Sequence, residues 1–270
     1  MATTLLHRTD NALWSFDVYH GLLYAINRNG RPQQNQGGTD VHSFYPANLS
    51  SRVTHVATSL HRTDNNLWEF SVLGYHANPS DTFSTNCDFY AINRRGLSGT
   101  TEVHVFSARS GYQAATHYAF RSWHAILDQT WTFGVSRVPG SSAGVCLIGI
   151  AAQGASRSPE AHIYRLNNLQ AHDHLVFANY PTDLNPLACK FAWAGSDRIG
   201  YRLYMVSPRG PSGSTEIVRL DHNQPPVRTV SSIGPTDNAL WDFVGDSQSG
   251  HLYAVCRHGL SGMTEYERLT

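Results

Sequence analysis

LLHRTDNALWSF, residues Leu5 to Phe16, decides the fold because the chain repeats it. The segment recurs as SLHRTDNNLWEF at Ser59 to Phe70 and as GPTDNALWDF at Gly234 to Phe243, with weaker copies at Ile126 to Phe133 and Pro181 to Phe191. The anchor positions, which follow one another after 54, 63, 58 and 52 residues, are Trp14, Trp68, Trp131, Cys189 and Trp241. Repeats of about this length are typical of propellers and solenoids.

A second element, a polar loop that leads into a strand, recurs in the same order. It reads RRGLSGTTEVHVF at Arg94 to Phe106, PRGPSGSTEIVRL at Pro208 to Leu220 and RHGLSGMTEYERL at Arg257 to Leu269. In four units an acidic residue follows a glycine by six positions, and in the first unit by ten. The glycine and acid of the five units are Gly30 and Asp40, Gly96 and Glu102, Gly154 and Glu160, Gly210 and Glu216, and Gly259 and Glu265.

Each unit contains four short apolar or alternating segments bounded by Gly, Pro, Asn and Ser, which is the pattern of β-strands. No segment has a sustained helical period. We therefore predict an all-β fold, a five-bladed β-propeller with four antiparallel strands per blade. The last unit is one strand short, and Thr3 to Arg8 resembles the missing strand. We expect this N-terminal strand to complete the last blade and to remove an exposed sheet edge.

A single propeller domain over residues 1–270 is expected, with blades at about 9–58, 59–121, 122–180, 181–232 and 233–270 plus 1–8. Lys and Arg total 20, and so do Asp and Glu, so the net charge gives no reason to expect nucleic acid as a partner. We find no signal peptide and no apolar run long enough for a membrane span, and expect a cytoplasmic protein. The four widely spaced cysteines are expected to be reduced and mostly buried.

The repeated TDN-x-L-W segment has two interpretations. Asp and Asn favour a tight turn, after which the Leu and Trp would pack between neighbouring blades. Alternatively, the indole faces a pocket and stacks on a ligand. Cys189 replaces the tryptophan in the fourth unit, so a site that depends on tryptophan would be weak or missing there.

The arginine, glycine and glutamate of the loop element also have two interpretations. The glutamate could pair with the arginine of its own hairpin or accept loop N–H bonds, but a surface ion pair is worth only about 0.2–1 kcal/mol. Alternatively, the arginine donates and the glutamate accepts, and together they hold two neighbouring hydroxyls of a sugar. A tryptophan or tyrosine would cover the apolar face of the sugar ring.

The segment LWDFVGDSQSGHLYAV, Leu240 to Val255, resembles the blade motif of the tachylectin family, five-bladed propeller lectins of this size. The number of units and the chain length agree over the whole chain. The arginine and glutamate on successive strands, with a tryptophan from the next blade, are also similar to fungal fucose-binding propeller lectins. This resemblance implies several shallow carbohydrate sites at blade junctions and no catalysis.

Carried over to this chain, the resemblance assigns carbohydrate binding to Arg28 and Asp40 with Trp68, Arg95 and Glu102 with Trp131, Arg209 and Glu216 with Trp241, and Arg257 and Glu265 with Trp14. His258 stands where other units have the arginine, so Arg257 is taken in its place. The third unit departs most, with Gln153, Pro159 and Cys189 at the matching positions. The sites are therefore not expected to be equivalent.

Two other classes of protein remain open. One is an enzyme, a hydrolase or a cyclase or isomerase of an apolar metabolite, with one asymmetric pocket near the propeller axis. Its polar groups would come from the non-repeated segments, with candidates His20, His76, Asp81, His124 and Asp128. The other is a scaffold for protein interactions.

His172 and His174 could share one face of a strand and ligate a metal, but no third ligand is evident from spacing, so we expect no metal and no cofactor. Among the three classes, the sequence favours a non-catalytic lectin. Its partners would be glycans or glycoproteins, with no membrane span, and the sequence leaves open whether the chain forms a homo-oligomer.

Overall fold

The computed structural model describes residues 2–3, 13–33, 36–44, 52–61, 63, 67–74, 87–97, 99–113, 115–124, 131–140 and 144–270. Side chains of residues 2–3, 31–33, 36–37, 52–55, 121–124 and 172 lie outside that description. Of the candidate pocket groups, His76, Asp81 and Asp128 lie outside the described residues, as does the side chain of His124. His20 lies in the tight turn between the first two strands of the first sheet, with φ of 54°.

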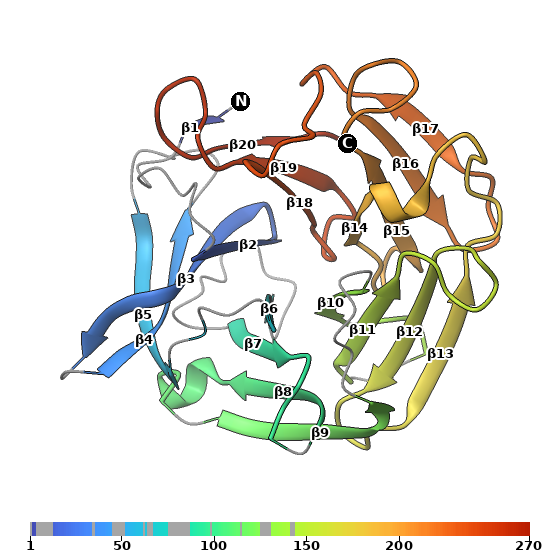
Figure 1. Cartoon of the computed structure of the whole chain (residues 1–270). Coiled ribbons are helices and arrows are strands. Elements are labelled where there is room, and N and C mark those ends of the chain that lie inside the picture. Colours follow the sequence, from blue (N-terminus) through green and yellow to red (C-terminus); the bar gives the residue numbers. More distant parts are fainter. Residues whose placement is uncertain are drawn as a thin grey trace. The chain divides into compact units, whose positions relative to one another are not determined.

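Five four-stranded antiparallel sheets make up the described structure (Figure 1). We number them as blades in chain order. Blade 1 holds β2 (Trp14–Tyr19), β3 (Leu22–Gln33), β4 (Gln36–Phe44) and β5 (Arg52–His61); blade 2 holds β6 (Trp68–Gly74), β7 (Cys87–Asn93), β8 (Thr100–Phe106) and β9 (Ala115–His124); blade 3 holds β10 (Trp131–Ser136), β11 (Cys146–Ala151), β12 (Glu160–Arg165) and β13 (Ala171–Val176); blade 4 holds β14 (Lys190–Trp193), β15 (Arg202–Ser207), β16 (Glu216–Asp221) and β17 (Val227–Val230); blade 5 holds β18 (Trp241–Gly245), β19 (Leu252–Cys256), β20 (Glu265–Arg268) and β1 (Ala2–Thr3).

The predicted fold class is confirmed: the chain is an all-β five-bladed propeller, and blades 1 to 4 are each a meander of consecutive strands. The repeated tryptophan begins the first strand in blades 1, 2, 3 and 5, and the repeated glutamate or aspartate lies in the third strand or opens it. In blade 5, β1 pairs with β20 through Ala2 opposite Tyr266 and Thr3 opposite Glu265. The N-terminal strand therefore adds to the last blade as predicted, although residues 4–8 lie outside the described part.

The chain divides into two compact units, Met1–Leu127 with Val255–Glu267, and Asp128–Ala254 with Arg268–Thr270. Blades 1 and 2 belong to the first unit, blades 3 and 4 belong to the second, and the strands of blade 5 are divided between the two. The expected single domain and its blade limits stay predictions. The contacts described below all lie within one unit.

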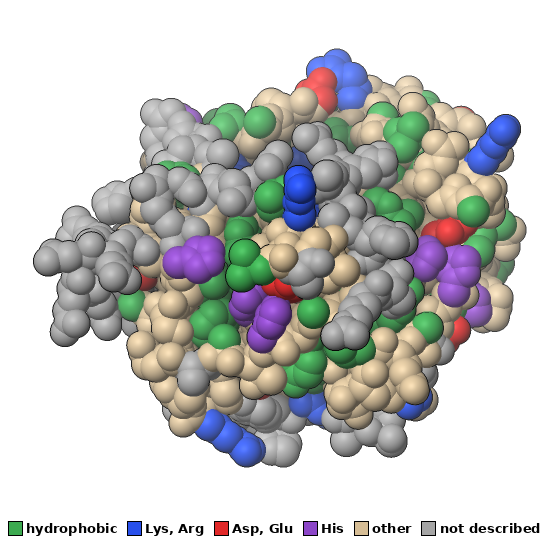
Figure 2. Space-filling view, turned by 60° about the horizontal axis from the view of Figure 1, so that its bottom comes forward, with side chains coloured by type: hydrophobic (Ala, Val, Ile, Leu, Met, Phe, Trp, Pro, Cys, Tyr) green, Lys and Arg blue, Asp and Glu red, His purple; other side chains and the backbone are tan. Residues whose placement is uncertain are grey.

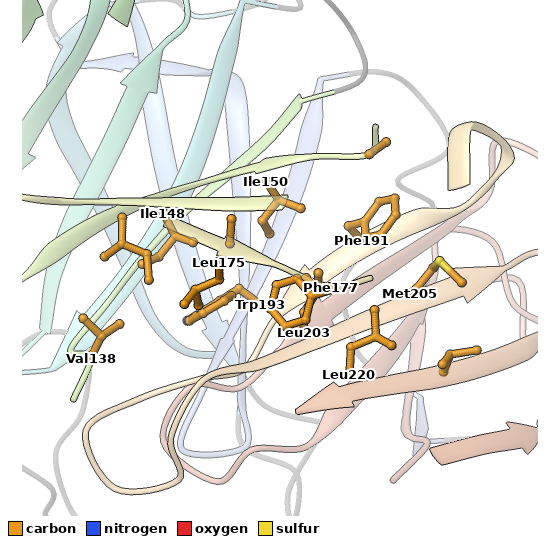
Figure 3. Close-up of a cluster of buried hydrophobic side chains, with 14 of the residues drawn as sticks. Val138, Ile148, Ile150, Leu175, Phe177, Phe191, Trp193, Leu203, Met205 and Leu220 are labelled. Carbon is orange, nitrogen blue, oxygen red and sulfur yellow. The ribbon is translucent and has the colours of Figure 1, made fainter. Parts of the chain in front are cut away.

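Within the second unit, blades 3 and 4 pack face to face through a buried apolar cluster (Figure 3). Alternating strand residues supply it, so that Ile148 and Ile150 of β11 meet Leu203 and Met205 of β15. Trp193 is also part of this cluster and donates its indole N–H to the carbonyl of Gly195. Burying each large apolar side chain contributes about 1.5–3 kcal/mol, so this packing holds the two neighbouring sheets together.

Two short 3-10 turns, η2 (Ala108–Ser110) and η3 (Pro186–Ala188), are the helical elements of the described residues. No helix in this part of the chain is long and apolar enough to cross a membrane. The four cysteines form no disulfide in the structure, and all except Cys189 are buried.

Candidate metal centre

The acidic residue of each blade turns its carboxylate back onto its own loop, against the repeated glycine. A Cβ on Gly96 would lie 1.7 Å from Cδ of Glu102, and a Cβ on Gly154 would lie 2.0 Å from Cδ of Glu160. In blades 1, 4 and 5 a Cβ on the glycine would lie 2.2, 2.4 and 2.1 Å from the carboxylate carbon of the acid. Non-bonded atoms cannot approach so closely, so glycine is repeated because the folded-back carboxylate occupies the place of a side chain.

Loop N–H groups hold one oxygen of the glutamate in three blades. Oε1 of Glu160, Glu216 and Glu265 accepts the backbone N–H of the serine four residues earlier, at 3.0, 2.7 and 2.9 Å. All three carboxylates are buried, with residue exposures of 2%, 1% and 6%. This confirms one of the structural interpretations of the glutamate, the acceptance of loop N–H bonds. It also leaves the second oxygen, Oε2, available for another partner.

In blade 2 two histidines meet Oε2 of the buried Glu102. His104 is two residues further along β8, on the same face, and His117 lies directly opposite His104 on β9. Nε2 of His117 is 3.0 Å from Glu102 Oε2, and Nε2 of His104 is 3.8 Å from it. The buried Nε2 of His104 has no hydrogen-bond partner among the described residues.

Blade 3 repeats the arrangement. Glu160 and His162 share a face of β12, and His174 lies opposite His162 on β13. Nε2 of His174 is 3.1 Å from Glu160 Oε2, and Nε2 of His162 is 3.5 Å from it. In both blades the three potential ligand atoms lie within 4.8 Å of one another.

In blades 2 and 3 the tryptophan that begins the first strand contacts the inner histidine, which is the histidine two residues after the glutamate. The ring centroids of Trp68 and His104 are 5.4 Å apart, and those of Trp131 and His162 are 5.2 Å apart. The outer histidine, on the next strand, contacts the inner one: the rings are tilted with a centroid distance of 4.7 Å in blade 2 and stacked with a distance of 4.3 Å in blade 3. Histidine side chains reach the surface in small groups, some of them beside acidic side chains (Figure 2). About half of the side-chain surface of His117 and of His174 is exposed, so solvent reaches both clusters.

The electrostatics favour an ionised carboxylate at Glu160 and a neutral inner imidazole in each blade. Burial opposes ionisation of Glu160, but hydrogen bonds from Ser156 and from His174 outweigh it and lower its pKa to about 2. Burial, followed by the neighbouring outer histidine, lowers the pKa of His162 and likewise that of His104. A carboxylate and two neutral imidazoles are the protonation states that bind a metal ion.

The donor spacing fits a metal ion. Bonds of 2.0–2.1 Å in a tetrahedral arrangement place the donor atoms about 3.3 Å apart. The distances from the carboxylate oxygen to the four histidine nitrogens run from 3.0 to 3.8 Å. The longest of these distances, 3.8 Å in blade 2, is too long for a hydrogen bond but is compatible with two donor atoms bound to one metal ion. Two imidazoles and one carboxylate form a set of ligands for a divalent transition metal, and the side that is open to solvent leaves room for a further ligand.

Blade 4 has the same loop and glutamate but a different partner. Val218 occupies the position of the inner histidine, and Arg228 lies opposite it on β17. Arg228 donates from Nε to Oε2 of Glu216 at 2.7 Å and from Nη1 to Asp183 at 2.8 Å. In blade 5 the position after Glu265 and Tyr266 is Glu267. Neither blade therefore offers the pair of histidines.

The arginines predicted to bind sugar are mostly engaged elsewhere. Arg28 donates to the Ser15 hydroxyl at 2.8 Å and to the carbonyl of Trp68 at 3.0 Å, so the structure brings this arginine to the predicted tryptophan. Arg209 bonds Asp237 at 2.7 Å. The guanidinium of Arg257 lies 5.2 Å from the ring of Phe16, in the strand that Trp14 begins. Arg95 is exposed.

The acids and tryptophans of the predicted sugar sites have the following positions. Asp40, Glu102, Glu216 and Glu265 are buried at their loops. Trp14, Trp68 and Trp131 each contact a histidine of their own blade, and Trp68 is 3% exposed. The carbonyl of Trp241 accepts a bond from Lys190. The assignment of these side chains to carbohydrate stays a prediction.

Sequence reasoning missed His104, His117 and His162, because it considered only His172 and His174 as metal ligands. His174 does meet a second histidine, but that residue is His162, from the preceding strand. A signal was available in the sequence: an acid, one residue and then a histidine recur at Asp40 and His42, Glu102 and His104, and Glu160 and His162.

No protein-family model matches the sequence, and a search of curated proteins found no match. Among solved structures, the chain is similar to the endo-arabinase of Bacteroides thetaiotaomicron VPI-5482, at 12% identity and a TM-score of 0.49, covering 100% of this chain and 98% of that one.

Two further solved structures give weaker likenesses. The catalytic domain of the Coprinopsis cinerea GH62 α-L-arabinofuranosidase has 12% identity and a TM-score of 0.44, covering 94% of this chain and 84% of that one. The β-propeller domain of the Trilobed protease from Pyrococcus furiosus has 6% identity and a TM-score of 0.36, covering 100% of this chain and 71% of that one.

These findings correct the prediction of a non-catalytic, fucose-binding-like lectin. The similar propellers are an endo-arabinase and an arabinofuranosidase rather than tachylectins or fucose-binding lectins. The tachylectin-like motif at Leu240 to Val255 describes the strand, turn and strand of a propeller blade, which the fold requires whatever the protein binds. At these identities the likeness concerns the fold and assigns no activity to this chain.

Proposed function

We propose that this propeller binds divalent transition-metal ions, with Zn²⁺ as the best fit, at one site in blade 2 and one in blade 3. The observation that carries the proposal is the repetition of the same three donors. In both blades a glutamate, the histidine two residues later and a histidine on the next strand converge in the same strand register.

The choice of metal follows from the donor atoms. Imidazole nitrogens suit zinc, copper, nickel and iron, whereas calcium and magnesium require mostly oxygen ligands. One carboxylate and two imidazoles without a thiolate resemble the donor sets of catalytic rather than structural zinc sites. The free thiol of Cys146 is buried in the apolar cluster and offers no competing donor.

A preorganised carboxylate supports the same conclusion. Oε1 of Glu160 accepts bonds from both the N–H and the hydroxyl of Ser156, at 3.0 and 2.6 Å. These bonds orient the other oxygen toward the histidines before any ion arrives. Partners of this kind around a metal ligand are worth about 10–100-fold in metal affinity when they are present.

A second candidate function follows from the open side of each cluster. Three protein ligands leave at least one coordination position for water, and a zinc-bound water ionises near neutral pH. The chain could therefore hydrolyse an activated ester at these clusters. Zinc-dependent hydrolysis of p-nitrophenyl acetate that disappears in His117→Ala/His174→Ala would support this function, and an unchanged rate would exclude it.

Metal binding is tested on the whole chain after removal of metals with a chelator. Zn²⁺ is titrated by calorimetry into the unaltered chain, His117→Ala, His174→Ala and the double variant. We expect each single substitution to lower the number of bound ions by one and the double variant to lose two. Both histidines are about half exposed, so their removal should leave the fold intact.

His251→Ala is the matched control, because this partly buried histidine lies outside both clusters. It should bind as many ions as the unaltered chain. If the number and affinity of bound ions are the same in all five proteins, the proposal is wrong.

A further inference from the structure

Blade 1 contains the same pattern of donors in the same register. Asp40 opposes Ala57, Val41 opposes Val56, and His42 opposes His55 without interruption. Blade 2 likewise places His104 opposite His117, and blade 3 places His162 opposite His174. The backbone of blade 1 therefore sets an acid, an inner histidine and an outer histidine position in the same relation.

The acid of blade 1 is held as the glutamates are. Its loop is longer, because ten residues rather than six separate Gly30 from Asp40. Even so, a Cβ on Gly30 would lie 2.2 Å from Cγ of Asp40, and Asp40 is 4% exposed. The extra loop residues thus preserve the folded-back carboxylate. The shorter aspartate is opposed by Asn27, just as Glu102 is opposed by Asn93.

The inner histidine of blade 1 also has the same environment. The ring centroids of Trp14 and His42 are 5.5 Å apart with the planes tilted by 58°. The matching pairs have 5.4 Å and 51° in blade 2, and 5.2 Å and 46° in blade 3. His42 is partly buried, as are His104 and His162. In blades 1, 2 and 3 the inner histidine therefore has the same position relative to the tryptophan of its blade.

We infer that blade 1 carries a third divalent-metal site, with ligands from Asp40 and His42 and with His55 at the register position that the outer histidine has in blades 2 and 3. This inference deepens the proposed function and rests on it. His55 is assigned by its register position alone. Blades 4 and 5 lack the pattern because Val218, Arg228 and Glu267 occupy the matching positions, so the chain would bind three ions rather than five.

The test isolates blade 1 by removing the other two sites. Co²⁺ is titrated into the full-length His117→Ala/His174→Ala protein, and binding is followed by visible absorption, which reports nitrogen and oxygen coordination. We expect one strongly bound ion in this protein and three in the unaltered chain. Adding His55→Ala, or separately Asp40→Asn, should weaken the remaining site more than about 100-fold.

The outcomes separate the inference from the proposed function. Two strong ions in the unaltered chain and none in His117→Ala/His174→Ala would overturn the blade 1 site while leaving the sites of blades 2 and 3 intact. One remaining ion that survives both His55→Ala and Asp40→Asn would overturn it as well. No strong ion in the unaltered chain would overturn both. Circular dichroism on each variant checks that the sheets are retained.

Discussion

Blades 3 and 4 share a loop, a glycine and a buried glutamate, yet they neutralise that glutamate in different ways. In blade 3, Oε2 of Glu160 faces His162 and His174. In blade 4, Oε2 of Glu216 accepts a bond from Arg228, which also pairs with Asp183. The outer strand supplies the partner in both blades, from the same register position.

The difference separates what the fold requires from what the chemistry requires. The folded-back carboxylate closes the loop in all five blades, so its presence is not evidence of a binding site. The partner of its second oxygen varies from blade to blade. An arginine is a permanent cation within the chain, whereas imidazoles can bind a metal ion whose charge then balances that of the carboxylate.

The largest expected effect is on metal affinity in blade 3. His162→Ala removes a direct ligand, and we expect more than a 100-fold loss of Zn²⁺ affinity at this blade, since even the supporting partners of ligands are worth about 10–100-fold. Arg228→Ala should leave Zn²⁺ binding unchanged, because blade 4 has no histidine at either position. Competition titration with a chromophoric chelator measures both. Equal losses in the two variants would contradict the distinction between the blades.

The next largest effect is on the free energy of unfolding, and it concerns the glycine beside the folded-back glutamate that blades 3 and 4 share. Gly154→Ala and Gly210→Ala would each force a Cβ into the glutamate carboxylate, at 2.0 and 2.4 Å. We expect both to lower the free energy of unfolding by about 3 kcal/mol, the upper end of the usual cost of overpacking. Urea denaturation measures the loss. Gly213→Ala is not a neutral control, because its φ of 81° strains any side chain, but Gly144→Ala meets no atom within 4 Å and should cost much less.

A smaller effect distinguishes the two partners. Arg228→Ala leaves the buried Oε2 of Glu216 without its cation, and we expect a cost of about 2 kcal/mol. His174→Ala in the absence of metal should cost less, because His162 still lies 3.5 Å from Oε2 of Glu160, whereas Arg228 is the cation that faces Oε2 of Glu216. Urea denaturation in a chelating buffer compares the two variants. A larger loss for His174→Ala would contradict the role assigned to Arg228.

The smallest effect is a dependence on pH in blade 4. Burial opposes ionisation of Glu216, but bonds from Ser212 and Arg228 outweigh it and lower its pKa. A lowered folded pKa contributes stability above the unfolded value of about 4.3, and that stability is lost as pH falls toward the folded pKa. The difference in melting temperature between the unaltered chain and Glu216→Gln should therefore shrink between pH 6 and pH 3. A difference that grows toward low pH would contradict this assignment.

Much of the fold could be predicted from the sequence because the constraints are local and repeated. Trp68 begins a strand, and Gly96 makes room for the carboxylate of Glu102, six residues later. Such short-range requirements return in every blade, so the chain displays them as a period. The terminal strand at Ala2–Thr3 followed from the same count.

The candidate site could not be predicted as well because its last ligand comes from another strand. His117 and His174 lie 13 and 12 residues after their inner histidines, beyond a turn whose length varies. Only the antiparallel register shows that they lie opposite His104 and His162. The partners of the arginines were not predicted for a similar reason: Arg209 lies at the start of the loop, but its guanidinium bonds Asp237, on the segment that precedes β18.

Anomalous X-ray diffraction above and below the zinc absorption edge, from crystals grown with Zn²⁺, tests the central claim most directly. The account predicts one zinc peak within bonding distance of Glu102, His104 and His117, a second beside Glu160, His162 and His174, and none beside Glu216 and Arg228. Zinc beside Glu216 and Arg228, or no zinc at either Glu-His-His cluster, would contradict it.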